Sequence, residues 1–78
     1  MADDTITYLP IPSDLERLPL IRIPIDPTEE NGLRKPSEIM VDRIQTSTLS
    51  CIGGIIGHID RNTMRLVESA LMVHLGLV

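Results

Sequence analysis

The stretch Ser37–Thr46, SEIMVDRIQT, begins with three consecutive apolar residues, Ile39, Met40 and Val41. A strand with one solvated face alternates apolar and polar residues, so an unbroken apolar run predicts a strand that is covered on both faces. Polar residues then interleave with Ile44 in the second half of the stretch. The pattern predicts a central strand that leaves the core, ending either in a solvated surface or in a recognition site.

The other elements are expected to pack around this strand. β-Branched and aromatic residues predict a strand over Thr5–Leu9, and isoleucine-rich sequences predict two more over Pro19–Ile25 and Gly53–Ile59, the last one short and bent at its glycines. In Pro19–Ile25, Arg22 and Pro24 are expected on the less buried side. Loops are expected over three further segments, the second of which contains an Asn-Gly turn with positive φ: Asp14–Leu18, Asp26–Lys35 and Ser47–Cys51.

A helix is predicted over Asp60–Gly76, because Asp60 suits the N-cap and Gly76 suits the position just past the last turn. Apolar residues cover about half of its circumference, which is wider than the ~100° stripe of an ordinary surface helix. One side can cover the sheet, and the other side predicts contact with a second subunit. Residues 1–78 are expected to form a single small domain whose sheet has an unpaired edge at its first strand.

Composition excludes several classes of function. The single cysteine, Cys51, precludes an internal disulfide and favours a cytoplasmic location, and no apolar run reaches the ~18 residues that span a membrane. Tyr8 is the only aromatic residue, so the chain has no platform for base stacking. Residues 1–31 carry seven acidic and two basic side chains, whereas residues 32–78 carry four and five. An anion site is therefore expected in the second half, near Arg34, Lys35 and Arg43.

No pattern of metal ligands occurs, because His58 has no His, Cys or Asp at a ligand spacing.

Several motifs resemble those of the MazF/PemK toxins, a family of type II toxin–antitoxin systems. The resemblance rests on ENGLRKPSEIMVDRIQT and on the tail GGIIGHIDRNTMRLVESALMVHLGLV, and LPIPSDLERLPLIRIPIDP is similar to the strand–loop–strand segment that precedes them. It covers residues 5–78, the C-terminal part of the family's domain. No single motif is decisive, but their order and spacing make the match specific.

The resemblance implies a mainly β fold with a C-terminal helix, an SH3-like (CcdB/MazF-type) small barrel that is incomplete in this chain. It implies a homodimer or strand-sharing oligomer, a cognate antitoxin and no membrane association. Members of the family cut single-stranded RNA without a metal or other cofactor, and the RNA 2′-hydroxyl is the nucleophile. Such a reaction needs a proton acceptor and donors that stabilise the charged phosphorane.

The resemblance also implies the site residues. Asp42 and Arg43 occupy the pair that lines the RNA groove in relatives, and Thr46 follows on the same strand; Arg43 would hold phosphate and Asp42 would orient a base or a water. Pro12 stands at the position of the family's functional threonine, which leaves the neighbouring Ser13 as the candidate catalytic hydroxyl.

The sequence departs from the family before residue 5. Relatives carry about thirty more residues there, with two strands and an arginine-bearing loop. Three functions follow: an RNA-cleaving toxin, a non-catalytic toxin remnant that dimerises and binds an antitoxin or nucleic acid, and a gyrase poison of the CcdB kind. The last requires a tryptophan at the end of the helix, and this chain has none.

Overall fold

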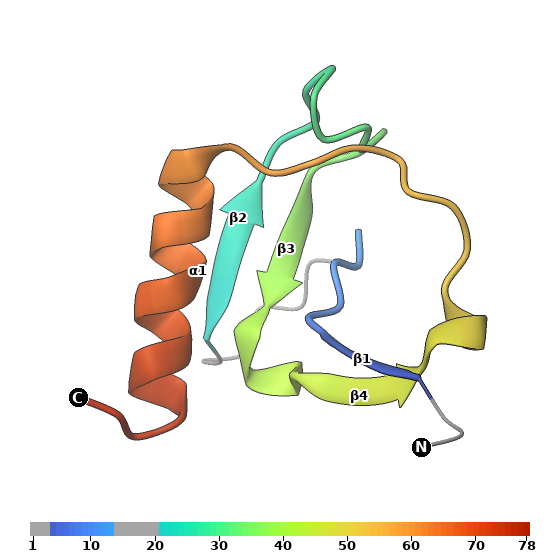
Figure 1. Ribbon diagram of the computed structural model, residues 1–78. Helices are drawn as coiled ribbons and strands as arrows, with labels where there is room; N and C mark the ends of the chain where they lie inside the picture. Colours follow the sequence, from blue (N-terminus) through green and yellow to red (C-terminus); the bar gives the residue numbers. More distant parts are fainter. Residues whose placement is uncertain (1–3, 14–20) are drawn as a thin grey trace.

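A computed structural model of the protein describes residues 4–13 and 21–78. Two antiparallel strand pairs, β1–β4 and β2–β3, precede a single helix that lies beside the second pair (Figure 1). This arrangement confirms a mainly β fold with a C-terminal helix. The predicted loop over Asp14–Leu18 lies outside the described residues, as do the first two residues of the strand predicted over Pro19–Ile25. The elements are β1 (Thr5–Tyr8), β2 (Arg22–Ile25), β3 (Ser37–Met40), a 3₁₀ turn (Val41–Arg43), β4 (Gln45–Thr48), a second 3₁₀ turn (Leu49–Cys51) and α1 (Arg61–His74).

The core forms where β2, β3 and α1 meet. Ile23 stands opposite Ile39 in the β2–β3 register, and both side chains are buried against Val67 of the helix. Val41, just after β3, is completely buried. Each such side chain stabilises the fold by about 1.5–3 kcal/mol through the apolar surface that it removes from water.

A second segment flanks β3 on the side away from β2. The amide of Glu38 donates to the carbonyl of Pro12 (3.2 Å), and the amide of Met40 donates to the carbonyl of Pro10 (2.9 Å). Proline has no N–H, so neither proline can return a hydrogen bond, and only half of a ladder forms. β3 is therefore a central strand, as predicted, although its second neighbour is not itself a regular strand.

The prediction of one strand over Ser37–Thr46 is wrong, because the chain breaks after Met40 into the 3₁₀ turn and resumes as β4. Met40 bonds Pro10 and Gln45 pairs with Tyr8, so the four residues 41–44 stand opposite the single residue Leu9. Residues 41–44 therefore form a β-bulge between β3 and β4, and these two strands together bond to residues 4–12. Such insertions bend a strand and redirect its side chains.

No strand forms over Gly53–Ile59, contrary to the prediction. The segment arches from the second 3₁₀ turn to the start of α1 (Figure 1), and the amide of His58 bonds the carbonyl of Glu30 at 2.8 Å. The isoleucines of this segment suit a strand, but no described strand pairs with it. The crossover predicted over Ser47–Cys51 is also wrong in its first half, because β4 extends to Thr48.

The helix matches its prediction closely. Asp60 precedes its first residue, and Gly76 takes φ +72° just past its end. The amide of Leu77 donates to the carbonyl of Met72 (2.8 Å) and that of Gly76 to Val73 (3.1 Å), a Schellman arrangement that satisfies two terminal carbonyls. No helix among the described residues is long and apolar enough to cross a bilayer.

The strand pairs do not close into a barrel within residues 4–13 and 21–78. β1 pairs with β4, β2 pairs with β3, and no ladder joins the free edge of β1 to another described strand. The apolar outer side of α1 is uncovered as well, with Leu66 and Val73 exposed, and Leu77 just past the end of the helix is also exposed.

Candidate functional site

The β-bulge presents the two residues that the sequence analysis singled out most strongly. The Asp42 carboxylate is held between two cations: its Oδ1 lies 3.4 Å from Nε of Arg22, and its Oδ2 lies 3.8 Å from Nε of Arg43. The Asp42 side chain is 11% exposed, whereas that of Arg43 is 58% exposed. The bulge therefore places the exposed guanidinium of Arg43 next to the largely buried carboxylate of Asp42.

Arg22 is the functional neighbour that sequence reasoning missed. Its side chain was expected on the less buried side of its strand but is only 5% exposed, and none of its three guanidinium nitrogens has a hydrogen-bond partner. Pro24, by contrast, is exposed as expected. The prediction for Arg22 is therefore wrong, and its burial goes with the ion pair to Asp42, which the 3₁₀ turn after β3 brings toward β2.

The β1–β4 pair carries hydroxyl groups on both of its faces, Thr7 and Thr46 on one and Tyr8 and Ser47 on the other. Thr46 stands directly opposite Thr7, and their Oγ1 atoms are 2.9 Å apart. The hydroxyl of Tyr8 lies 3.3 Å from Oγ of Ser47. Thr46 is exposed, so its hydroxyl can accept or donate a further hydrogen bond.

Ser13 lies apart from these residues. The exposed Ser13 follows Pro12, which bonds Glu38 at the start of β3, whereas Asp42 follows the end of that strand. Ser13 borders a shallow hollow of about 270 Å³ that has two cations on its rim, Arg34 and Lys35. The structure thus brings Asp42 and Arg43 together, places Thr46 on the next strand and leaves Ser13 in a separate basic hollow.

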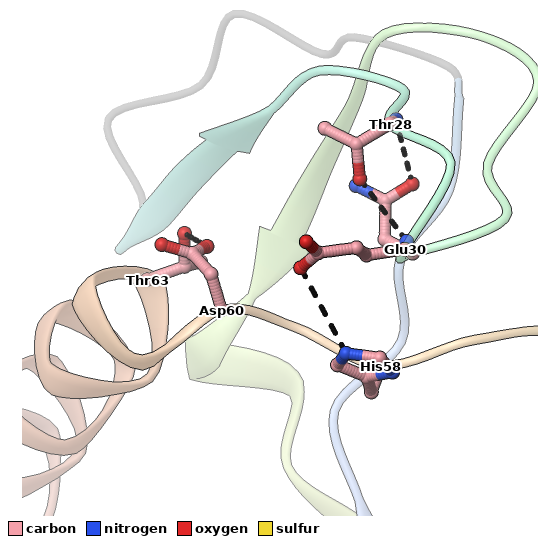
Figure 2. Close-up of polar contacts among 6 residues, drawn as sticks. Thr28, Glu30, His58, Asp60 and Thr63 are labelled. Carbon is pink, nitrogen blue, oxygen red and sulfur yellow. Dashed lines mark hydrogen bonds and ion pairs between the residues drawn. The ribbon is translucent and has the colours of Figure 1, made fainter.

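Another hollow, of about 400 Å³, is lined by several acidic residues, and Figure 2 shows polar contacts among residues of its wall. Glu30 and His58 face each other across it with 3.8 Å between Oε2 and Nε2. The Thr63 hydroxyl donates a hydrogen bond to the carboxylate of Asp60, and this bond lowers the pKa of Asp60. With Asp26 and Glu29 also on its wall, the hollow repels a phosphate chain. The described residues contain no cluster of three His, Cys, Asp or Glu side chains that could hold a metal ion.

Comparison with known proteins gives three concordant similarities. Residues 1–75 match the family described as PemK-like, MazF-like toxin of type II toxin–antitoxin system. The probable endoribonuclease MazF of Mycolicibacterium smegmatis is 32% identical over 76 residues, which cover 97% of this chain and 70% of that protein. The solved structure of the Mycobacterium tuberculosis toxin MazF-mt6 is similar with a TM-score of 0.76 and 25% identity, over 92% of this chain and 70% of that one.

Proposed function

Because the chain belongs to the PemK-like, MazF-like toxins of type II toxin–antitoxin systems, we propose that it is an endoribonuclease that cleaves single-stranded RNA. The observation that carries the proposal is the β-bulge, which holds the Asp42 carboxylate in place and leaves the Arg43 guanidinium exposed beside it. A relative named as a probable endoribonuclease supports the same reaction class.

The reaction needs only groups that the bulge and its neighbour β4 supply. A base takes the proton of the ribose 2′-hydroxyl and the 2′-oxygen bonds to the adjacent phosphorus. The bond from phosphorus to the 5′-oxygen breaks, and the 5′-oxygen takes a proton from a solvent water. Asp42 is the acceptor, directly or through a water, and Arg43 stabilises the charge that develops on the phosphorane. Thr46 positions a phosphate oxygen. The products are a 2′,3′-cyclic phosphate and a 5′-hydroxyl, and no metal or organic cofactor takes part.

The hollow beside Ser13 is proposed as a second contact for the RNA backbone. Arg34 and Lys35 are both exposed on its rim and can each neutralise a phosphate. Ser13 then donates a hydrogen bond to a phosphate and has no part in the chemical step, because it lies at the other end of β3 from Asp42. A strand of RNA that follows β3 would meet both cationic groups.

The quaternary arrangement is also a proposal. Residues 1–78 form one domain with the architecture of an incomplete SH3-like barrel, and the chain works as a homodimer or strand-sharing oligomer. The exposed helix residues Leu66 and Val73, with Leu77 just past the helix end, support such contacts. The proposed partner in the cytoplasm is a cognate antitoxin that occludes the RNA-binding residues.

A cleavage assay tests this function. We expect the purified protein to cut a long single-stranded RNA, and Arg43→Ala to lower the rate about tenfold or more because it removes the exposed cation. Arg61→Ala is the matched control, since Arg61 is also exposed but starts the helix. Equal rates for the two variants would exclude Arg43 from the reaction.

Two features favour a second function. Asp42 already has a buried ionic partner in Arg22, and Pro12 has replaced a hydroxyl-bearing residue of the family, so the chain could bind RNA or an antitoxin without cutting. RNA binding that depends on Arg43, together with no cleavage at any enzyme concentration, would support this non-catalytic toxin remnant over the enzyme.

A further inference from the structure

The exposed cation of the β-bulge lies on the side of the sheet that faces away from the core. Ile23 of β2 belongs to the core, so its neighbour Arg22 projects from the opposite face, which we call the outer face. Asp42 pairs with Arg22, and Arg43 pairs with Asp42. The guanidinium of Arg43 is therefore reached by a ligand from the outer face.

The outer face continues from the bulge onto the β1–β4 pair. Leu9 and Ile44 line the hollow of about 350 Å³ beside residues 7–11, on the core side of this pair. Tyr8 and Gln45 are their neighbours in the chain and stand directly opposite each other in the register, so both project outward. The Tyr8 hydroxyl lies 3.3 Å from Oγ of Ser47 on the same face, and this contact orients the ring.

The outer face of the β1–β4 pair is neutral. Residues 5–8 and 44–51 contain no acidic or basic side chain. The Tyr8 side chain is half-buried, and Gln45 is exposed. An aromatic ring can contact the flat face of a nucleobase, and a carboxamide offers both a donor and an acceptor to the edge of a base. This face suits a nucleobase, whereas Arg43 beside it suits a phosphate.

The spacing between Arg43 and Gln45 fits the two ends of one nucleotide. Gln45 follows Arg43 by two residues, so their backbones are at most roughly 7 Å apart along an extended chain. A base and its adjoining phosphate are joined through a single ribose, so a phosphate on Arg43 brings a base to Tyr8 and Gln45. Composition argued against a platform that stacks successive bases, and the single ring of Tyr8 serves one base only.

From these features we propose that Tyr8 and Gln45 form a nucleobase subsite beside Arg43, and that the base is adenine. A glutamine side chain makes two hydrogen bonds with N6 and N7 of adenine, whereas the same edge of guanine presents two acceptors and requires two donors. The subsite rests on the proposed function, because the phosphate on Arg43 is the one that is cut. Tyr8 and Gln45 determine specificity and make or break no bond.

Binding of RNA that cannot be cut tests the subsite separately from cleavage. The probes are short, labelled oligo(A) and oligo(U) that carry 2′-O-methyl groups and so lack the nucleophile. We expect fluorescence anisotropy to show that oligo(A) binds about tenfold more tightly than oligo(U). NMR locates the contact, because Tyr8 is the only tyrosine and its ring protons should shift upfield when a base stacks on them.

Substitution of Gln45 tests the reading of the base edge. Gln45→Ala removes the carboxamide, and Thr48→Ala is the matched control because Thr48 is exposed on the opposite face of the same strand. We expect Gln45→Ala to bind oligo(A) no more tightly than oligo(U), and Thr48→Ala to keep the tenfold preference. Both positions are exposed, and circular dichroism verifies that both variants fold.

Substitution of Tyr8 tests the contact with the face of the base. Tyr8→Phe keeps the ring and loses the hydroxyl, whereas Tyr8→Leu loses the ring as well. We expect the leucine variant to bind oligo(A) about tenfold more weakly than the phenylalanine variant. Equal binding by these two variants would exclude stacking on this ring.

The results distinguish this inference from the proposed reaction. Equal affinities of the protein for oligo(A) and oligo(U), or Tyr8 ring protons that stay in place when oligo(A) binds, would overturn the subsite and leave RNA cleavage standing. A preference for oligo(A) that depends on Gln45, without cleavage of ordinary RNA, would support the subsite and contradict the enzyme.

Discussion

At the level of single residues, Arg22 fixes Asp42 in position. Both side chains are largely buried, and each is the other's main counter-charge. Arg22→Met should destabilise the protein by about 3 kcal/mol, because it leaves the largely buried Asp42 carboxylate with only the exposed Arg43 as a counter-charge. Arg43→Met should cost less than about 1 kcal/mol, since that arginine is exposed. Urea unfolding measures both.

The double variant Arg22→Met/Asp42→Leu provides a control for this interpretation. Removing both charges should restore most of the stability lost in Arg22→Met, because an apolar pair needs no counter-charge. If the double variant is as unstable as the single one, the loss in Arg22→Met comes from packing and not from the lost counter-charge.

The ionisation of Asp60 makes the stability of the folded state depend on pH. The hydrogen bond from Thr63 holds the pKa of Asp60 below its ordinary value of 3.8, so the ionised form stabilises the folded state. The contribution is complete above that ordinary value and is lost as the pH falls through the lowered pKa of the folded protein. Thr63→Val should lower the melting temperature at pH 7, and its effect should shrink as the pH falls from 7 to below 3.8. A constant difference across this range would show that the hydroxyl acts in some other way.

At the level of elements, two glycines allow close contact between the loop before β3, residues 26–36, and the segment 53–59. Gly32 has φ +69°, and a Cβ at Gly32 would collide with the backbone carbonyl of Ile56; one at Gly57 would collide with that of Glu30. The buried Asn31 holds the loop rigid, because its Oδ1 accepts from the amides of Thr28 and Leu33. The loop therefore cannot move aside easily.

Alanine substitution tests this contact. Gly32→Ala and Gly57→Ala should each destabilise the protein by about 1–3 kcal/mol. Gly54→Ala is the matched control, because nothing lies within 4 Å of its Cβ position and its φ is ordinary. Thermal unfolding of the three variants measures the difference, and a cost at Gly54 equal to that at Gly57 would argue against the contact.

The elements also show what local sequence can predict. The helix was predicted nearly to its ends, because Asp60, Gly76 and its apolar periodicity are local signals. The break after Met40 was missed, since Val41 is as apolar as a strand residue and the bulge arises only from pairing with residues 8–10. The strand over 53–59 was predicted from a pattern that needs a neighbour to form a ladder.

At the level of the whole molecule, the described residues leave much apolar surface exposed for a small domain. Three parts are open to solvent: the free edge of β1, the hollow of about 350 Å³ beside residues 7–11, and the outer face of α1. Sequence reasoning anticipated the open edge and the exposed helix face. It could not predict that Ser13 would lie away from Asp42, because that separation depends on how residues 4–13 run along β3.

The most direct test of the account is the chemistry of the RNA ends that the protein produces in EDTA. We predict cleavage of single-stranded RNA into fragments with a 2′,3′-cyclic phosphate and a 5′-hydroxyl, and about a hundredfold slower reaction for Asp42→Asn, which keeps the shape of the side chain but not its basicity. Fragments with 5′-phosphate ends, or unchanged cleavage by Asp42→Asn, would contradict the mechanism proposed for the β-bulge.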